Sequence, residues 1–427
     1  MVDLKSSYRT VMDDRFPDDL TIDFGGQKLV YRKRAWTLDD GGKPVRKGLR
    51  YGENPGQEAA LYELVSGNLA LGGCSFIGPG RGLVSCLSEE GLAQFGKHPG
   101  KTNLTDLDNA LNIMRHLADR PACAIMKHNN PSGVAYGADA RDAYERANAG
   151  DRLAAFGGCA VLSVRVDGDA ARAMAENYLE LVAAPDFTGE ALAIFKAKKN
   201  LRVVRIADIA RIRDYAPLRF VDFKSLIDGG LIVQQSPANR IRTADDFLPA
   251  EAVRKDGTRV RVVRAPAPQE LEDLLFAWQV EQGVTSNSVL FAKNGATVAV
   301  GAGEQDRVGV AEIAVLKAYK KYADNLCFAR HGCLLFELKA KAAKGGVPAS
   351  AAEEIQRETA EARGGLIGAA AASDAFFPKR DGIDVILAEG ASAVAQPGGS
   401  LADAEIIDAV NDAGAAMVFT GQRAFKH

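Results

Sequence analysis

The chain lacks an excess of positive charge, a long apolar run and paired cysteines, and each absence excludes a class of function. Its 53 lysines and arginines are balanced by 55 aspartates and glutamates, so the net charge of -2 gives no general attraction for nucleic acid or an anionic membrane. No uninterrupted apolar run reaches the about 18 residues that span a bilayer, and Met1–Ser6 lacks the apolar core of a signal peptide. We therefore expect a cytoplasmic protein without nucleic-acid or membrane partners.

Cysteine is also sparse and scattered. The six cysteines, at positions 74, 86, 123, 159, 327 and 333, form no C-x-x-C pair and no His/Cys cluster at zinc spacing. Their mostly apolar neighbours favour reduced thiols in the core. We expect no metal site.

What the chain does have is a repeated alternation of short apolar runs with helical patterns. At 427 residues it exceeds the size at which single cores stop growing, so at least two lobes are expected. The alternation is typical of α/β layers around a mainly parallel sheet. In the first half it predicts a strand at Ala122–Met126, a helix at Ala140–Ala149, a strand at Cys159–Ser163, a helix at Asp169–Glu180 and a strand at Leu181–Ala184.

The same alternation recurs in the second half. It predicts a helix at Pro268–Gln279, strands at Val289–Ala292 and Thr297–Val300 joined by an Asn294-Gly295 turn, helices at Val308–Tyr322 and Ala402–Asn411, and a strand at Ala416–Phe419. Leu334–Arg363, rich in Ala, Lys and Glu, predicts two exposed helices. The first 48 residues contain a flexible turn at Asp39–Gly42 and have no assigned role.

The adjacent residues Lys127 and His128 are the most informative local feature. An apolar run ends directly before them, and the turn-forming sequence Asn129–Gly133 follows. A buried strand would thus deliver to one turn a lysine, which stabilises developing negative charge, and a histidine, which exchanges protons near neutral pH. Alone, the pair also fits a surface lysine beside a hydrogen-bonded histidine, because a dipeptide is a weak motif.

Six sequence blocks in a fixed order supply the context for this pair. They are Leu49–Gln57, Lys127–Gly133, Phe156–Gly158, Ser286–Ser288, Asp374–Pro378 and Arg423–His427. Together they closely resemble the AICAR transformylase part of the bifunctional purine-synthesis family that also carries IMP cyclohydrolase. The resemblance runs from about Arg50 to the last residue.

The resemblance implies an α/β fold of two cytidine-deaminase-like, three-layer lobes. It places the first lobe, with an N-terminal extension, in residues 1–230 joined by residues 325–366, and the second lobe in residues 231–427. Zinc deaminases carry H-x-E and P-C-x-x-C signatures. Because this chain has neither, we expect no zinc site and no deamination.

The resemblance also implies formyl transfer from 10-formyltetrahydrofolate, a co-substrate, to the 5-amino group of AICAR in purine biosynthesis. That amine is a weak nucleophile, so the reaction needs a base, close alignment and stabilisation of a tetrahedral oxyanion. His128 is the expected base, Lys127 the cation for the intermediate or the departing N10, and Asn287 the amide that orients or polarises reacting groups. Alone, Asn287 also fits a turn asparagine that bonds its own backbone.

Binding residues follow from the same resemblance. Arg50 and Arg423 are planar donors suited to a phosphate, and Glu180 can accept hydrogen bonds from ribose hydroxyls. The full set expected for AICAR is Arg50, Tyr51, Gly157, Glu180, Phe376 and Arg423. The set expected for the folate is Phe156, Arg307, Pro378, Asp381 and Ser400.

Some of these folate positions have plainer interpretations. The Asp381 carboxylate can accept two hydrogen bonds from an aminopyrimidine edge, but Asp381-Gly382 also fits a surface turn in which Arg380 pairs with Asp381. Pro397–Ser400 looks like a weak phosphate loop, yet it lacks the G-K-[ST] ending, so ATP use is not indicated.

Two residues depart from the family pattern. Gly56 replaces the histidine of Asn-Pro-His-Gln, and Lys379 replaces an apolar residue near the folate, so donor affinity or tail preference is expected to differ. The alternatives are a formyltransferase of this fold with another amine or donor, and a non-catalytic regulator that binds AICAR or folate. The intact Lys127, His128 and Asn287 argue against the regulator.

The remaining expectations concern partners. The region before Arg50 is too short for the family's cyclohydrolase domain, so we expect ring closure to require a separate IMP cyclohydrolase. By resemblance, we expect a homodimer whose sites combine residues of both subunits.

Overall fold

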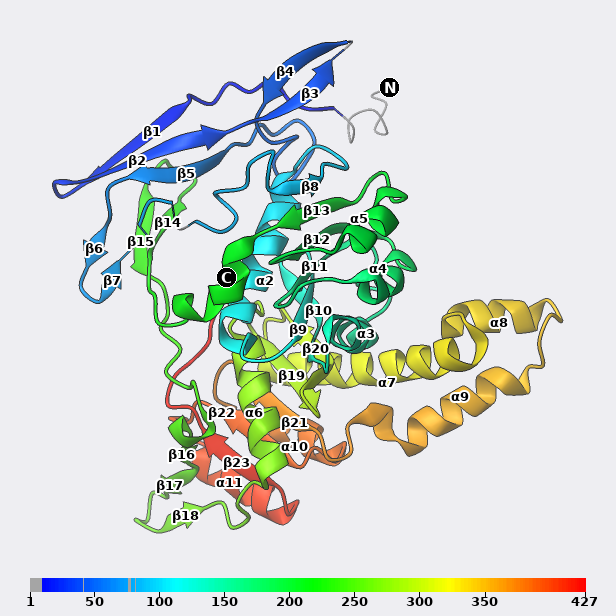
Figure 1. Cartoon of the computed structure of the whole chain (residues 1–427). Helices are drawn as coiled ribbons and strands as arrows, with labels where there is room; N and C mark the ends of the chain where they lie inside the picture. The colour runs from blue at the N-terminus through cyan, green and yellow to red at the C-terminus, as the bar shows by residue number, and fades with distance from the viewer. Residues whose placement is uncertain (1–9, 41, 76–77, 81) are drawn as a thin grey trace. The chain divides into compact units, whose positions relative to one another are not determined.

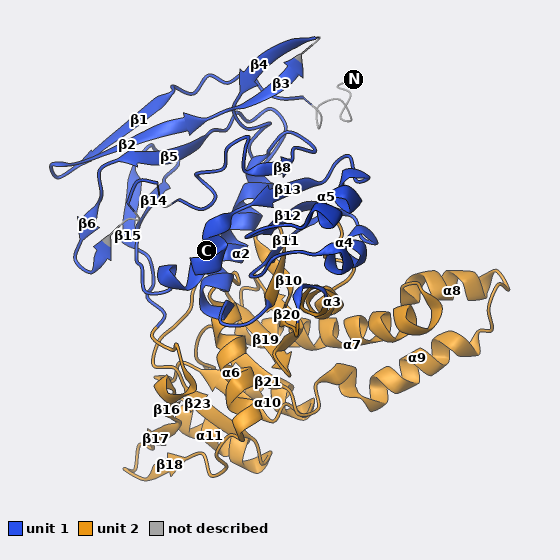
Figure 2. Cartoon of the chain, viewed as in Figure 1, with its two compact units in different colours: residues 1–121, 139–141, 157–239 blue, residues 122–138, 142–156, 240–427 orange. Residues whose placement is uncertain are grey.

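The computed structural model describes residues 10–40, 42–75, 78–80 and 82–427, which form two compact units (Figure 2). Met1–Ser6 and Gly41, on which the signal-peptide and turn predictions partly rest, lie outside the described residues. Unit 1 comprises Met1–Pro121, Asp139–Arg141 and Gly157–Asn239, and unit 2 comprises Ala122–Ala138, Asp142–Phe156 and Arg240–His427.

Unit 1 contains a mainly parallel set of sheet strands with one antiparallel edge strand, and separate groups of antiparallel strands (Figure 1). Its strands are β1 (Asp19–Phe24), β2 (Gln27–Arg34), β3 (Trp36–Asp40), β4 (Lys43–Lys47), β5 (Leu61–Ser66), β6 (Ala70–Leu71), β7 (Cys74–Ser75), β8 (Leu92–Gln94), β11 (Gly158–Leu162), β12 (Leu179–Ala184), β13 (Arg202–Arg205), β14 (Val221–Ser225) and β15 (Leu231–Gln235). Its helices are α2 (Lys101–Leu117), α4 (Gly168–Ala175), α5 (Gly189–Lys196) and the 3-10 helix η1 (Ala207–Tyr215).

Unit 2 contains a larger mixed sheet. Its strands are β9 (Ala122–Lys127), β10 (Asn130–Tyr136), β16 (Leu248–Pro249), β17 (Glu251–Val253), β18 (Arg259–Arg261), β19 (Ser288–Lys293), β20 (Ala296–Ala302), β21 (Ala370–Ser373), β22 (Ala393–Gln396) and β23 (Ala416–Phe419). Its helices are α3 (Ala140–Gly150), which starts in unit 1, α6 (Pro268–Glu281), α7 (Arg307–His331), α8 (Leu335–Ala343), α9 (Ser350–Glu361), α10 (Arg380–Ala388), α11 (Asp403–Asp412) and the short η2 (Ala244–Asp246) and η3 (Arg363–Gly365).

The predicted α/β class is confirmed, but the sheet is only partly parallel. β11, β12 and β13 are parallel in unit 1, and β21, β22 and β23 are parallel in unit 2. The pairs β9–β10 and β19–β20 are antiparallel, because two-residue turns join them and such turns cannot reverse a chain into a parallel pair. The predicted Asn294-Gly295 turn is one of the two.

Three layers build unit 2. Alternate residues of its strands, such as Val289 and Phe291, pack against α7, α10 and α11 on one face of the sheet. Residues of opposite parity, such as Ala370 and Ala393, pack against Leu274 of α6 on the other face. Period-2 alternation along the strands thus puts one helical layer on each face.

Helix limits follow local capping. The Asp306 side chain accepts a hydrogen bond from the Gly309 amide (2.6 Å) and starts α7, and Gly332 (φ 62°) ends it. Because no breaker intervenes, α7 runs beyond the predicted Val308–Tyr322. It continues into the two predicted helices of Leu334–Arg363, here α8 and α9, which extend away from the sheet of unit 2 (Figure 1). Leu338 and Ile355 belong to one small core, and most other residues of these two helices are exposed, as predicted.

The helix predicted at Asp169–Glu180 is too long. α4 ends at Ala175, and β12 begins already at Leu179 because Leu179 and Leu181 alternate with Glu180 in the manner of a strand. Glu180 therefore lies on a strand.

The compact units do not follow the predicted division at residue 230. The β9–β10 hairpin and Asp142–Phe156 belong with the C-terminal part, as does the 325–366 segment that was expected to join the first lobe. Pairing of β10 with β20, and packing of α9 on α7, explain both assignments. The evolutionary division into two deaminase-like lobes stays a prediction.

Candidate functional site

Lys127 and His128 stand at a tight turn in unit 2. Buried β9 ends at Lys127, and His128 (φ 51°) and Asn129 (φ 62°) form the two-residue turn before β10. Non-glycine residues at positive φ are uncommon, and such outliers cluster at functional sites. Lys127 is half-buried and His128 is exposed. The predicted delivery of both residues by a buried strand to a turn is confirmed.

Hydrogen bonds connect this turn to two distant segments of unit 2. The side-chain oxygen of Asn130 accepts from the Thr285 amide (2.9 Å), and Lys426 Nζ donates to the Asn129 carbonyl (3.3 Å). The Ser286 amide in turn donates to the Lys426 carbonyl (3.0 Å). The turn, the Thr285–Ser288 segment and the C-terminal segment therefore meet in one chain.

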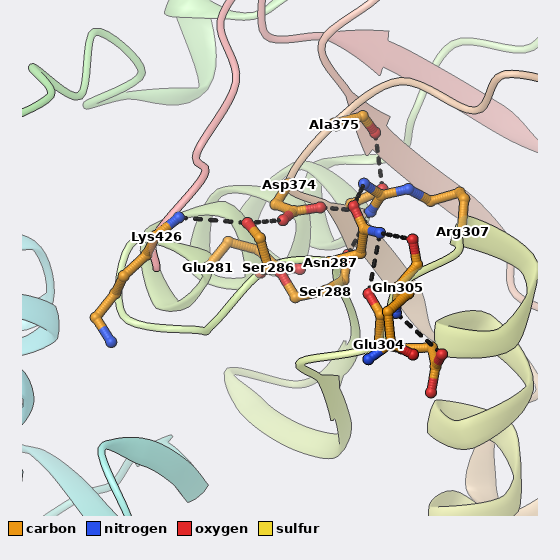
Figure 3. Close-up of polar contacts among 11 residues, drawn as sticks. Glu281, Ser286, Asn287, Ser288, Glu304, Gln305, Arg307, Asp374, Ala375 and Lys426 are labelled. Carbon is orange, nitrogen blue, oxygen red and sulfur yellow. Dashed lines mark hydrogen bonds and ion pairs between the residues drawn. The ribbon is translucent and has the colours of Figure 1, made fainter. Parts of the chain in front are cut away.

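Asn287 is held by a polar network (Figure 3). Its Nδ2 donates to the carbonyls of Glu304 and Gln305 (both 3.0 Å), and its Oδ1 accepts from Arg307 Nη2 (2.7 Å). Both amide protons are thus engaged, and Asn287 is oriented by a neighbouring side chain rather than by a simple turn.

Arg307 is itself enclosed. Its side chain is 7% exposed and forms an ion pair with Asp374, whose side chain is 0% exposed and also accepts from Ser286 Oγ. Nη1 of Arg307 also donates to the Ser288 carbonyl (2.9 Å). The predicted folate ligand therefore has its charge neutralised within the protein.

Glu281 lies behind this network and was missed in the sequence. It is completely buried at the end of α6, and its Oε2 accepts from Ser288 Oγ (2.6 Å). Burial, and secondarily the charge of Asp374, raise the pKa of Glu281 well above its usual range. An acidic residue three positions after the apolar run Leu274–Trp278 was the available signal.

A cavity of about 310 Å³ opens beside Asn287 in unit 2. Arg423 stacks on Phe425, with 4.8 Å from the guanidinium carbon to the ring centre, and gives this cavity a cationic and aromatic wall. The cavity brings together five predicted site residues, and its lining is Asn287, Gln305, Asp306, Arg307, Ala375, Phe376, Pro378, Arg423 and Phe425.

Three predicted folate residues, Phe156, Asp381 and Ser400, do not line this cavity. Asp381 is exposed, and its carboxylate accepts from the adjacent Gly382 amide (2.8 Å). Arg380 pairs with Asp384 (3.0 Å) and Asp412 (3.3 Å), so the surface pairing of Arg380 with Asp381 is wrong.

The Pro397–Ser400 loop is already engaged. The amides of Gly399 (2.7 Å) and Ser400 (3.1 Å) donate to the Asp403 carboxylate, an internal anion in the place where a phosphate loop would hold its ligand. Of the other predicted positions, Phe156 is 64% exposed, and Lys379 is exposed at the residue before α10, where its side chain makes no capping hydrogen bond. Gly56 (φ 90°) adopts a conformation that favours glycine, so its departure from the family has a local backbone cause.

Four predicted AICAR residues lie in unit 1. The Arg50 guanidinium stacks on Tyr51 (4.6 Å to the ring centre) and donates to the Tyr51 hydroxyl (3.2 Å). The Glu180 carboxylate accepts from Asn103 Nδ2 (2.9 Å). Gly157 (φ 71°) donates from its amide to the Tyr178 carbonyl (2.6 Å), in a conformation that favours glycine.

The N-terminal segment supports Arg50, a role that the sequence did not reveal. The Met12 amide donates to the Arg50 carbonyl (2.9 Å). His98 packs its ring edge-on against buried Trp36 (6.1 Å between ring centres) and bonds through Nε2 to the Gly48 carbonyl (2.6 Å). Burial, followed by the charges of Arg202 and Arg50, lowers the pKa of His98.

Other predicted features can be placed briefly. All six cysteines are free, and five are buried, with Cys86 half-buried. Across the described ranges, no group of three or more His, Cys, Asp or Glu side chains is arranged to hold a metal ion. Among the described helices, none combines the length and apolar character needed to cross a membrane.

Comparison with known proteins gives a consistent match. A family model described as AICARFT/IMPCHase bienzyme matches residues 34–317. The bifunctional purine biosynthesis protein PurH of Aquifex aeolicus (strain VF5) is 34% identical over 405 residues, 92% of this chain and 63% of that protein. The PurH proteins of Ruegeria sp. (strain TM1040) and Paracoccus denitrificans (strain Pd 1222) are each 37% identical over 385 residues, 90% of this chain and 60% of theirs. The chain therefore spans about six-tenths of the length of these relatives.

Proposed function

Because the chain belongs to the AICARFT/IMPCHase bienzyme family, we propose that it transfers the formyl group of 10-formyltetrahydrofolate to the 5-amino group of AICAR. The observation that carries the proposal is the meeting, in unit 2, of the Lys127-His128 turn with the Thr285–Ser288 segment and the C-terminal segment. That arrangement anchors the turn that carries the proposed base and cation to the segment that carries the oriented amide, and the mixing experiment below decides whether one site takes the two from the same chain or from two subunits.

The reaction requires a balanced exchange of one bond and one proton. The amine nitrogen bonds to the formyl carbon, the bond from that carbon to folate N10 breaks, and the proton lost by the amine is matched by one gained at N10. His128 is the proposed base for the amine, and Lys127 is the proposed cation that stabilises the tetrahedral oxyanion or the departing N10.

Asn287 has a narrower proposed role than the sequence suggested. Since both of its amide protons are donated to backbone carbonyls, its remaining capacity is as an acceptor at Oδ1. We propose that Oδ1 orients the substrate amine and that Arg307 acts as a positioning residue through Asn287. Phe376, Pro378 and Arg423 then line the substrate cavity, while binding roles for Phe156, Asp381 and Ser400 stay predictions.

In unit 1, Arg50, Tyr51, Gly157 and Glu180 are the proposed AICAR contacts. We further propose that, of the two activities in the family name, these 427 residues carry formyl transfer, and that ring closure depends on an IMP cyclohydrolase elsewhere. A cytoplasmic location fits this pathway.

A direct assay follows tetrahydrofolate release from 10-formyltetrahydrofolate with and without AICAR. AICAR-dependent release, with the formylated product and no IMP, is the expected result. Release that does not depend on AICAR would refute the proposed substrate, and IMP formed by the pure chain would refute the single activity.

A homodimer with shared sites is the proposed assembly. Mixing inactive His128→Ala with inactive Asn287→Ala chains should then restore part of the activity. If exchanged subunits restore none, each site takes both residues from one chain, in line with the bond between Asn130 and Thr285 within unit 2.

A further inference from the structure

Arg202 is a buried arginine held by backbone carbonyls. It begins β13, is 1% exposed, and donates to the carbonyls of Glu180 (Nη1, 3.2 Å) and His98 (Nη2, 3.0 Å). Its Nε is buried and has no hydrogen-bond partner. The hydrogen bonds of this buried cation go only to carbonyl oxygens, and the nearby Glu180 carboxylate offsets part of its charge. Burying such a charge is costly unless it is balanced.

Arg50 brings a second charge to the same place. The Arg50 amide donates to the Pro99 carbonyl (2.7 Å), the peptide group next to the one that binds Arg202. Burial, followed by the charge of Arg50, lowers the pKa of Arg202 to about 10. The Arg50 Nε is also buried without a hydrogen-bond partner. The two like charges repel each other, and a bound anion would relieve that repulsion.

No carboxylate in the described part of the chain forms an ion pair that would relieve this repulsion. Neither guanidinium forms an ion pair there, and the Glu180 carboxylate, which offsets part of the charge, is hydrogen-bonded to Asn103. The amino end of α2 adds to the positive potential, since Gly100 offers no capping side chain. A Cβ on Gly100 would lie 3.5 Å from Arg50 Nη2, so Arg50 lies directly over this helix start.

We propose that Arg202 is a positioning residue for the phosphate monoester of the substrate: it adds a second positive charge beside the phosphate contact already proposed for Arg50 and fixes the His98–Gly100 turn at the amino end of α2. The inference rests on the proposed function for the identity of that monoester, AICAR. Arg202 acts by charge and by fixing the His98–Gly100 turn, so it need not reach the phosphate itself.

The test compares binding of AICAR and of its dephosphorylated nucleoside by calorimetry. Arg202→Gln should weaken AICAR binding about tenfold, the scale of a charge interaction of about 1.4 kcal/mol, and should leave nucleoside binding unchanged. Arg202→Lys, which keeps the charge but loses the two-pronged donor, should lose less. Arg205→Gln is the matched control, because Arg205 is on the same strand but pairs with Asp186 (2.9 Å) at the surface.

Two results would overturn the inference: unchanged AICAR binding by Arg202→Gln, or equal losses for AICAR and nucleoside. If Arg202→Gln does not fold, Arg202→Lys decides. A loss of AICAR affinity in Arg202→Lys that exceeds its loss of nucleoside affinity supports the inference, and equal losses for the two ligands contradict it. Tetrahydrofolate release separates this inference from the proposed function. If AICAR binding depends on Arg202 but no tetrahydrofolate is released, formyl transfer alone is refuted. If tetrahydrofolate is released and the KM for AICAR is unchanged in Arg202→Gln, the anion role of Arg202 alone is refuted.

Discussion

Arg50 in unit 1 and Arg307 in unit 2 were both expected to bind ligands, yet their surroundings differ. Arg307 is neutralised by Asp374 and uses its donors on Asn287, Ser288 and Ser373. Arg50 has no carboxylate partner among the described residues and lies beside a second arginine, Arg202. An arginine with its charge already paired positions its neighbours, whereas one left unpaired beside another cation is ready for an incoming anion.

The largest expected difference between the two arginines is in how much their loss lowers the free energy of unfolding. Arg307→Met leaves Asp374 charged, buried and unpaired, so we expect a loss of about 3 to 5 kcal/mol in the free energy of unfolding. Arg50→Gln removes a charge without a partner and should cost under about 1 kcal/mol. Urea denaturation of both variants measures this difference. Adding Asp374→Asn to Arg307→Met should recover part of the loss, and equal costs for the two single variants would remove the distinction between the arginines.

The chemical step should depend on His128 in unit 2 more than on Arg50 and Arg202 in unit 1. His128→Ala removes the proposed base and should lower kcat about 10²-fold or more, with AICAR binding largely intact. Steady-state rates together with AICAR calorimetry check this. Near-normal turnover would rule out His128 as the base, and a change confined to KM would make it a binding residue.

Glu281 gives unit 2 a dependence of stability on pH. Its pKa is raised in the folded state by burial and then by Asp374, so the folded state holds a proton that the unfolded state releases. Stability is therefore full below the unfolded pKa and falls as pH rises through the folded pKa. Glu281→Gln should abolish this fall and gain stability relative to the parent as pH increases from about 5 to 9. If the stability of both proteins changes with pH in the same way, Glu281 does not hold the proton that the folded state retains.

His98 should give unit 1 the opposite and smaller dependence. Its pKa is lowered by burial and then by Arg202 and Arg50, so the unfolded state takes up a proton first. Stability is then full above the unfolded value of about 6.5 and falls as pH drops through the folded pKa. His98→Gln, which can still donate to the Gly48 carbonyl, should flatten the curve between about pH 7 and 5. An unchanged slope would contradict this assignment.

The sequence predicted the elements well where local rules govern them. The strand before Lys127, the Asn294-Gly295 turn and the two helices of Leu334–Arg363 all follow from apolar period and turn residues. α7 is longer than predicted because the first residue that ends it is Gly332. Glu180 was assigned to a helix instead of a strand because the residues around Leu179 fit both a helical and a strand pattern.

The candidate site was predictable only in part, because partners distant in sequence decide the role of each residue. The family blocks named Asn287 and Arg307, but nothing local shows that Arg307 pairs with Asp374, 67 positions away. Arg202 and His98 lie outside every block, and only the folded unit 1 brings them to Arg50.

The contrast between the arginines is tested most directly by initial rates of tetrahydrofolate release over a grid of AICAR and 10-formyltetrahydrofolate concentrations. Arg50→Gln should raise the KM for AICAR about tenfold or more with kcat largely kept, because it removes a ground-state anion contact. Arg307→Lys should lower kcat with both KM values kept, because it disturbs Asn287. A raised folate KM with unchanged kcat in Arg307→Lys, or an unchanged AICAR KM in Arg50→Gln, would contradict the account.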